Sequence, residues 1–88
     1  MKVVYVLQSI PLPSQSYVGV TDHLKRRLAK HNAGLSSHTA KYRPWRVVVA
    51  VQFEDDAMAV RFERYLKSGS GHAFLKRHFW PSAEGPRF

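Results

Sequence analysis

The sequence predicts an α+β domain in which helices flank a small three-stranded, mainly antiparallel sheet, with the element order ββαβαα. β-Branched and aromatic residues form three runs, at 3–7, 16–20 and 45–53, and this composition is typical of strands. Apolar residues at helical spacing follow the second and third of these runs, which indicates helices between and after the strands. Elements in this order are expected to pack as layers around one core.

The first two strand runs are predicted to form a hairpin. The segment between them, QSIPLPSQS, is rich in proline and serine, which favour a loop. Because side chains alternate along a strand, Tyr17 and Gly19 are expected on one face of the second strand. The third run, WRVVVAVQF, has a continuous apolar centre. We therefore expect it to lie centrally in the sheet, with both of its faces covered.

The first predicted helix runs from about His23 to Asn32 and ends at Gly34. Its apolar stripe is narrow, and Arg27 and His31 lie four residues apart at the margin of that stripe. These two side chains are thus expected to be neighbours.

Two further helices are predicted, at about 57–68 and at 70–79, the latter capped by Ser70. The polar, serine-rich segment 35–44 is predicted to be a loop. We expect one domain at 1–80, because a chain of 88 residues is too short to build two cores, and a partly disordered tail at 81–88.

The charge of the chain indicates an anionic partner. Fourteen Lys and Arg residues oppose six Asp and Glu residues, for a net charge of +8, and such a field attracts nucleic acid. A ribosome-like structural role, a membrane surface or solubility alone are alternatives. No signal peptide or membrane-spanning stretch is evident. The absence of cysteine is compatible with the cytosol, so we expect a soluble, cytoplasmic protein.

Few side chains offer chemistry, and each has a structural explanation. Glu63 is the one acidic residue in the middle of a predicted helix, yet a helical Glu often only pairs with a Lys four residues later, here Lys67. Tyr5 and Tyr17 are compatible with cross-strand packing. No histidines have a convincing zinc-ligand spacing. Taken singly, these residues favour structural roles.

Taken together, the same residues carry a family resemblance. Val3, Val4 and Tyr5 stand where the GIY-YIG nucleases have their first tripeptide, and Tyr17, Val18 and Gly19 where they have the second. The pattern continues through the following residues: Thr21, Leu24, Arg27, His31, Asn32, Pro44, Glu63 and the KSGSG turn at 67–71. The sequence thus resembles a small single-domain member of the GIY-YIG superfamily over about residues 2–79.

This resemblance implies a metal-dependent endonuclease that hydrolyses phosphodiester bonds. Glu63 is the implied ligand of Mg²⁺ or Mn²⁺, and Arg27 the implied clamp on the phosphate oxygens. Tyr17 would activate the attacking water, Tyr5 would position it, and His31 would take or relay a proton. Gly19 would keep the second strand free of a side chain close to the site.

The implied substrate is DNA rather than RNA, cut with structure-directed or weak sequence specificity during repair, recombination or processing, or with a protein partner that supplies specificity. The alternative is a non-catalytic nucleic-acid-binding module that retains the nuclease fold. Phosphate contacts are expected from the following residues: Lys25, Arg26, Lys30, Lys41, Arg43 and Lys67, with Lys76 and Arg77 in addition. Where some family nucleases place an Asn after the second helix, this chain has SGSGH, so Ser68, Ser70 or His72 would substitute there or the support is missing.

Overall fold

The computed structural model describes residues 1–81 as a three-layered α+β fold with the order ββααβαα. The elements are the strands β1 (Lys2–Ser9), β2 (Ser16–Thr21) and β3 (Trp45–Phe53) and the helices α1 (Leu24–Asn32), α2 (Ser37–Ala40), α3 (Asp56–Leu66) and α4 (Gly69–His78). The predicted fold class is confirmed. Most of the predicted tail, 82–88, lies outside the described residues. None of the described helices is long and apolar enough to cross a membrane.

The sheet has the strand order β2-β1-β3, and both strand pairs are antiparallel. The central strand is therefore β1, and the prediction that β3 lies centrally is wrong. The apolar run of β3 has another cause, because helices cover both of its faces: Val47 packs on one side of the sheet, and Val48 and Val49 on the other. Coverage of both faces does not require a partner strand at both edges.

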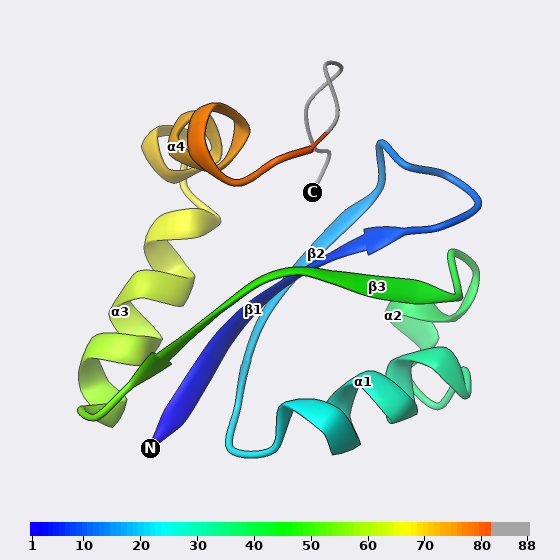
Figure 1. Cartoon of the computed structure of the whole chain (residues 1–88), viewed down its shortest axis with the longest axis horizontal. Helices are drawn as coiled ribbons and strands as arrows, with labels where there is room; N and C mark the ends of the chain where they lie inside the picture. Colours follow the sequence, from blue (N-terminus) through cyan, green and yellow to red (C-terminus); the bar gives the residue numbers. More distant parts are fainter. Residues whose placement is uncertain (82–88) are drawn as a thin grey trace.

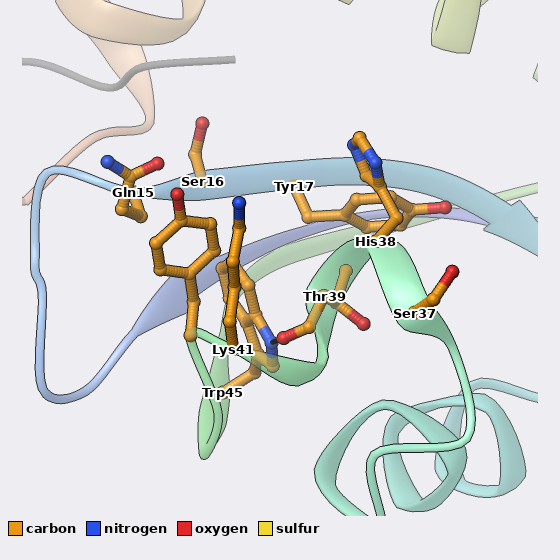
Figure 2. A pocket seen from close by; sticks show the side chains of 9 residues that line it. Gln15, Ser16, Tyr17, Ser37, His38, Thr39, Lys41 and Trp45 are labelled. Carbon is orange, nitrogen blue, oxygen red and sulfur yellow. Dashed lines mark hydrogen bonds between the residues drawn. The ribbon is translucent and has the colours of Figure 1, made fainter.

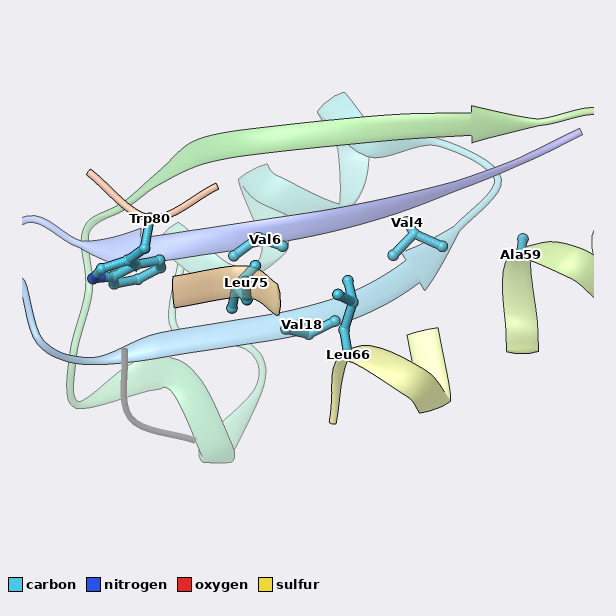
Figure 3. Close-up of a cluster of buried hydrophobic side chains, with 7 residues drawn as sticks. All are labelled: Val4, Val6, Val18, Ala59, Leu66, Leu75 and Trp80. Carbon is cyan, nitrogen blue, oxygen red and sulfur yellow. The ribbon is translucent and has the colours of Figure 1, made fainter. Parts of the chain in front are cut away.

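Helices α1 and α2 lie on one side of the sheet, and α3 and α4 on the other (Figure 1). The α3 and α4 side holds the larger apolar core, where Val4, Val6 and Val18 of the sheet meet the helices (Figure 3). Trp80 also packs there and is only 8% exposed. On the opposite face, Tyr5 forms a second cluster that includes Leu7 and Trp45. The alternation along β1 thus sends Tyr5 toward α1.

Helix α2 occupies part of the segment that was predicted to be a loop. Ser36 precedes it in an extended conformation, and the helix has only four residues, too few to show a periodic pattern in the sequence. Tertiary contacts hold it: the indole nitrogen of Trp45 donates to the carbonyl of Thr39 at 3.0 Å. Asn32 in turn fixes Trp45, because its side-chain amide bonds both the amide and the carbonyl of that residue.

The cap of α4 also differs from the prediction. Ser68, not Ser70, is the N-cap, and its hydroxyl accepts from the amide of Gly71 at 3.2 Å and donates to the carbonyl of Tyr65 at 2.6 Å. Helix α4 consequently begins two residues earlier than a Ser70 cap would allow, directly after α3 ends.

Candidate active site

A buried chain of hydrogen bonds joins β1, α1 and α2. The Tyr5 hydroxyl lies 3.0 Å from Nε2 of His31, and Nδ1 of His31 lies 2.8 Å from the hydroxyl of Thr39. All three residues are buried. Because the Thr39 hydroxyl donates to the Ser36 carbonyl, we assign the imidazole proton to Nδ1, so that Nε2 accepts from Tyr5. His31 therefore fixes the orientation of the Tyr5 hydroxyl.

The two titratable residues in this series of hydrogen bonds, Tyr5 and His31, are neutral near pH 7. Burial raises the pKa of Tyr5 to about 12, with Arg27 opposing the rise and Tyr17 adding to it. Burial, and then the positive charge of Arg27, lower the pKa of His31 below its usual value. Tyr5 is consequently a phenol that donates a hydrogen bond, and His31 is a neutral imidazole that accepts it.

We expect the fold to lose stability as the pH falls below about 6.5, and His31 to cause part of the loss. An unfolded chain protonates His31 at its ordinary pKa of about 6.5, whereas the folded chain does so only at lower pH. The unfolded state then binds more protons, and the free energy of unfolding decreases until the folded pKa is reached. Thermal unfolding of wild type and of His31→Gln, at pH values above those at which carboxylates titrate, measures this decline in stability. Equal declines in both proteins would contradict it.

Tyr17 of β2 packs against these hydrogen-bonded residues. Its ring centroid lies 4.8 Å from that of His31, 6.1 Å from that of Tyr5 and 6.3 Å from that of His38. Figure 2 shows the Tyr17 ring beside His38 of α2. Gly19 lies directly opposite Tyr5 across the strand pair, and a Cβ there would lie 2.5 Å from the Tyr5 hydroxyl and 2.9 Å from the Tyr17 ring. Glycine at this position therefore allows the two phenols to approach.

Arg27 brings positive charge to the two phenols from α1. Its side chain is exposed, and its interactions with Tyr5 and, less strongly, with Tyr17 raise the pKa of the guanidinium. Together with Lys30 and His31, Arg27 also lines a hollow of about 370 Å³. The guanidinium thus stands where an anion from solvent can reach it while the phenols lie beside it.

Glu63 belongs to α3, on the other side of the sheet. Its carboxylate forms an ion pair with Lys67, one helical turn later, at 2.5 Å, and only 15% of the Glu63 side chain is exposed. The Lys67 ammonium also lies 6.0 Å from the ring centroid of Tyr17. Lys67 therefore connects Glu63 to the tyrosines.

The donor set suits a cation that is held only partly by protein. Within residues 1–81, no three His, Cys, Asp or Glu side chains gather into a metal cluster. Glu63 is a largely buried carboxylate, and the ammonium group of Lys67 lies beside it. Sites for Mg²⁺ typically use one or two carboxylates, several waters and the substrate phosphate. These residues fit such a site and not a cage built by the protein alone.

The sequence model of the GIY-YIG family, described as the GIY-YIG catalytic domain, matches residues 1–76. The chain belongs to the GIY-YIG family.

Several curated proteins similar to this GIY-YIG chain carry the name "Structure-specific endonuclease subunit SLX1". The protein of Candida dubliniensis is 42% identical over 82 residues, which cover 85% of this chain and 27% of the relative. The protein of Scheffersomyces stipitis is 40% identical over 82 residues, covering 85% and 23%. The chain is thus a GIY-YIG nuclease domain related to SLX1, and it spans about a quarter of the length of these relatives.

A solved structure supports the GIY-YIG fold. The solution NMR structure of a UPF0213 protein from Bacillus halodurans is 28% identical and superposes with a TM-score of 0.54, covering 92% of this chain and 89% of its own. The likeness extends over nearly the whole chain.

The eight basic residues predicted to contact phosphate are all exposed, including Lys76 and Arg77 of α4. Lys25, Arg26 and Lys30 lie on α1, and Arg26 and Lys30 share one hollow with Arg27. Lys41 and Arg43 follow α2, and Lys67 follows α3. The basic residues of α1 therefore extend the surface on which Arg27 stands.

Thr39 is the member of this site that the sequence did not indicate. The structure brings Tyr5, Tyr17, Arg27 and His31 together, as their shared motif pattern suggested, but Thr39 lies in the segment predicted to be a loop. A threonine between His38 and Ala40 carries no distinguishing pattern. Its role depends on the tertiary contact with His31.

Proposed function

We propose that this GIY-YIG chain is a divalent-metal-dependent endonuclease that hydrolyses phosphodiester bonds in DNA. The observation that carries the proposal is the position of Tyr17. It packs against the Tyr5–His31 pair near Arg27, and Lys67 links it to Glu63. A module that only binds phosphate gains nothing from a carboxylate here, because Glu63 neutralises the Lys67 ammonium, which would otherwise attract phosphate. The arrangement therefore favours hydrolysis over mere binding.

Each residue has a role in hydrolysis that follows from its charge. A Mg²⁺ or Mn²⁺ ion bound to Glu63 would polarise the phosphate and stabilise the leaving oxygen. Arg27 binds the non-bridging oxygens as negative charge develops on them. Tyr17 orients the attacking water and acts as its base in the phenolate form, which the nearby guanidinium of Arg27 stabilises, so that taking the proton of the water returns Tyr17 to the neutral phenol.

Tyr5 and His31 support Tyr17. With its pKa at about 12, Tyr5 keeps its proton and holds the geometry as a hydrogen-bond donor. His31 accepts that hydrogen bond through Nε2 and packs on the Tyr17 ring. As a neutral imidazole beside the two phenols, it is the base that takes the proton released when Tyr17 becomes a phenolate.

A pocket beside Tyr17 supports action on unpaired nucleotides. It measures about 440 Å³ and is lined by residues of β2, α2 and the segment after α2, including His38 and Lys41 (Figure 2). Tyr42 lines it as well. The Lys41 ammonium lies 5.2 Å from the Tyr42 ring centroid, and an aromatic ring beside a cation suits a stacked base with its phosphate. This volume holds a single nucleotide better than a duplex, which favours flaps, branches, ends or single strands as substrates.

The names of the relatives extend this proposal. They are structure-specific endonuclease subunits, which supports structure-directed cleavage and a protein partner that contributes specificity. Branched DNA as substrate and DNA repair as the setting complete the proposal. Cytoplasmic localisation stays a prediction.

Cleavage of labelled single-stranded, duplex, flap and branched DNA, and of matched RNA, tests the function. We expect product only with Mg²⁺ or Mn²⁺, and faster cleavage of DNA that has unpaired nucleotides beside the cut. Binding should weaken steeply between about 50 and about 200 mM salt, since phosphate contacts release counterions. Salt-dependent binding without product from any substrate would identify a binding module instead, and binding that is flat across this range would contradict phosphate contacts.

A further inference from the structure

The ion pair between Glu63 and Lys67 is asymmetric in its burial. Only 15% of the Glu63 side chain is exposed, compared with 49% of the Lys67 side chain. A largely buried carboxylate needs a positive partner close by. Lys67 has a flexible four-carbon stem and is half exposed, so its ammonium can leave the carboxylate without a change in the backbone.

Lys67 has a second environment available within the same site. Its ammonium lies 6.0 Å from the ring centroid of Tyr17. It also lines a hollow of about 290 Å³ with Tyr17, Ser16 and His38. An ammonium released from Glu63 would therefore remain beside Tyr17, where a substrate phosphate would give it a new anionic partner.

We propose that Lys67 is the internal counter-ion of the metal site. Its ammonium occupies the cation position of Glu63 in the metal-free chain, and it turns to the substrate phosphate once a divalent cation takes that position. This inference rests on the proposed function, because it assumes that Glu63 is the metal ligand. It assigns Lys67 as a positioning residue that competes with metal for Glu63 and then helps to hold DNA.

An ordinary pair of helix residues four apart predicts something different. Such a pair on a solvated face adds slightly to helix stability, and its loss would leave DNA binding little changed. A competing counter-ion predicts two opposite effects. Removing the ammonium frees Glu63, so metal should bind more tightly, and it removes a phosphate contact, so DNA should bind less tightly.

The experiment compares Lys67→Met with Arg64→Met. Arg64 is exposed on the same helix, so its replacement removes one positive charge close to Glu63 without breaking the ion pair. Mn²⁺ binding to the full chain without DNA is measured by titration calorimetry, and binding of a labelled flap DNA is measured in saturating Mn²⁺ at times too short for cleavage. Neither measurement depends on cleavage.

We expect Lys67→Met to bind Mn²⁺ roughly two- to fivefold more tightly than wild type, as expected for the loss of a partly exposed competing pair, and to bind DNA more weakly. Arg64→Met should change Mn²⁺ affinity less. An equal increase in Mn²⁺ affinity in both variants would show that net charge causes the effect, and this would overturn the proposal. Unchanged Mn²⁺ affinity in Lys67→Met would overturn it as well.

Glu63→Gln separates this inference from the proposed function. If Glu63→Gln loses Mn²⁺ binding but Lys67→Met binds Mn²⁺ like wild type, the counter-ion role is wrong and the metal site stands. If Glu63→Gln binds Mn²⁺ as wild type does, Glu63 is not the ligand, and both proposals are overturned.

Discussion

Replacing Glu63 by glutamine is expected to reduce metal-dependent cleavage of DNA about a hundredfold or more while the chain stays folded. Glutamine keeps the size and helix propensity of glutamate but has no charge to hold a hard cation. A catalytic metal supplies several kcal/mol of transition-state stabilisation, and ~1.4 kcal/mol corresponds to a factor of ten in rate. Single-turnover cleavage of a flap substrate at high Mg²⁺ measures the effect, and circular dichroism reports folding.

The matched control for this experiment is Glu54→Gln. Glu54 is exposed in the turn before α3, so its replacement changes net charge by the same amount at a distance from Tyr17. It should cleave like wild type. Equal losses in both variants would indicate a general charge effect, and unfolding of Glu63→Gln would assign the ion pair with Lys67 a structural role in place of a catalytic one.

The fold was predictable where the chain carries a local pattern. The strand predicted at 45–53 coincides with β3, Trp45–Phe53, because β-branched residues gather in this run. Likewise, alternation placed Tyr17 and Gly19 on one face, and the register sets Gly19 opposite Tyr5. These features depend on spacing along a strand, which a sequence displays directly.

What the sequence left open depends on contacts between distant elements. His31 was expected at the margin of an apolar stripe, yet it is 1% exposed because Thr39 and Tyr5 enclose both ring nitrogens. No helical period distinguishes this position from an exposed one. In the same way, i,i+4 spacing predicted that Lys67 pairs with Glu63, but only the packing of α3 near β2 brings the ammonium to Tyr17. The motif pattern grouped the site residues, whereas tertiary packing determines their burial and charge.

Replacing Gly71 by alanine is expected to destabilise the fold by about 3 kcal/mol or more. A Cβ at this position would lie 1.6 Å from the carbonyl oxygen of Tyr65 and 2.7 Å from Cα of Leu66. Both are backbone atoms of α3, so the helices must separate to admit one methyl group. In a domain of this size, such a loss corresponds to a fall in Tm of about 12 °C or more, which thermal unfolding measures.

Gly69→Ala is the control, because it makes the same chemical change in the same helix. A Cβ at Gly69 meets nothing within 4 Å, and alanine is the better helix former by up to ~1 kcal/mol, so this variant should be as stable as wild type or slightly more stable. Similar Tm values for the two variants would show that α3 and α4 can separate with little loss of stability. The contrast bears on the KSGSG turn, where Ser68 caps α4 and Gly71 permits the close crossing. If alanine is destabilising at Gly71 but not at Gly69, close packing of α3 and α4 explains the glycine at position 71. The SGSGH segment then needs no metal-supporting side chain to explain its composition.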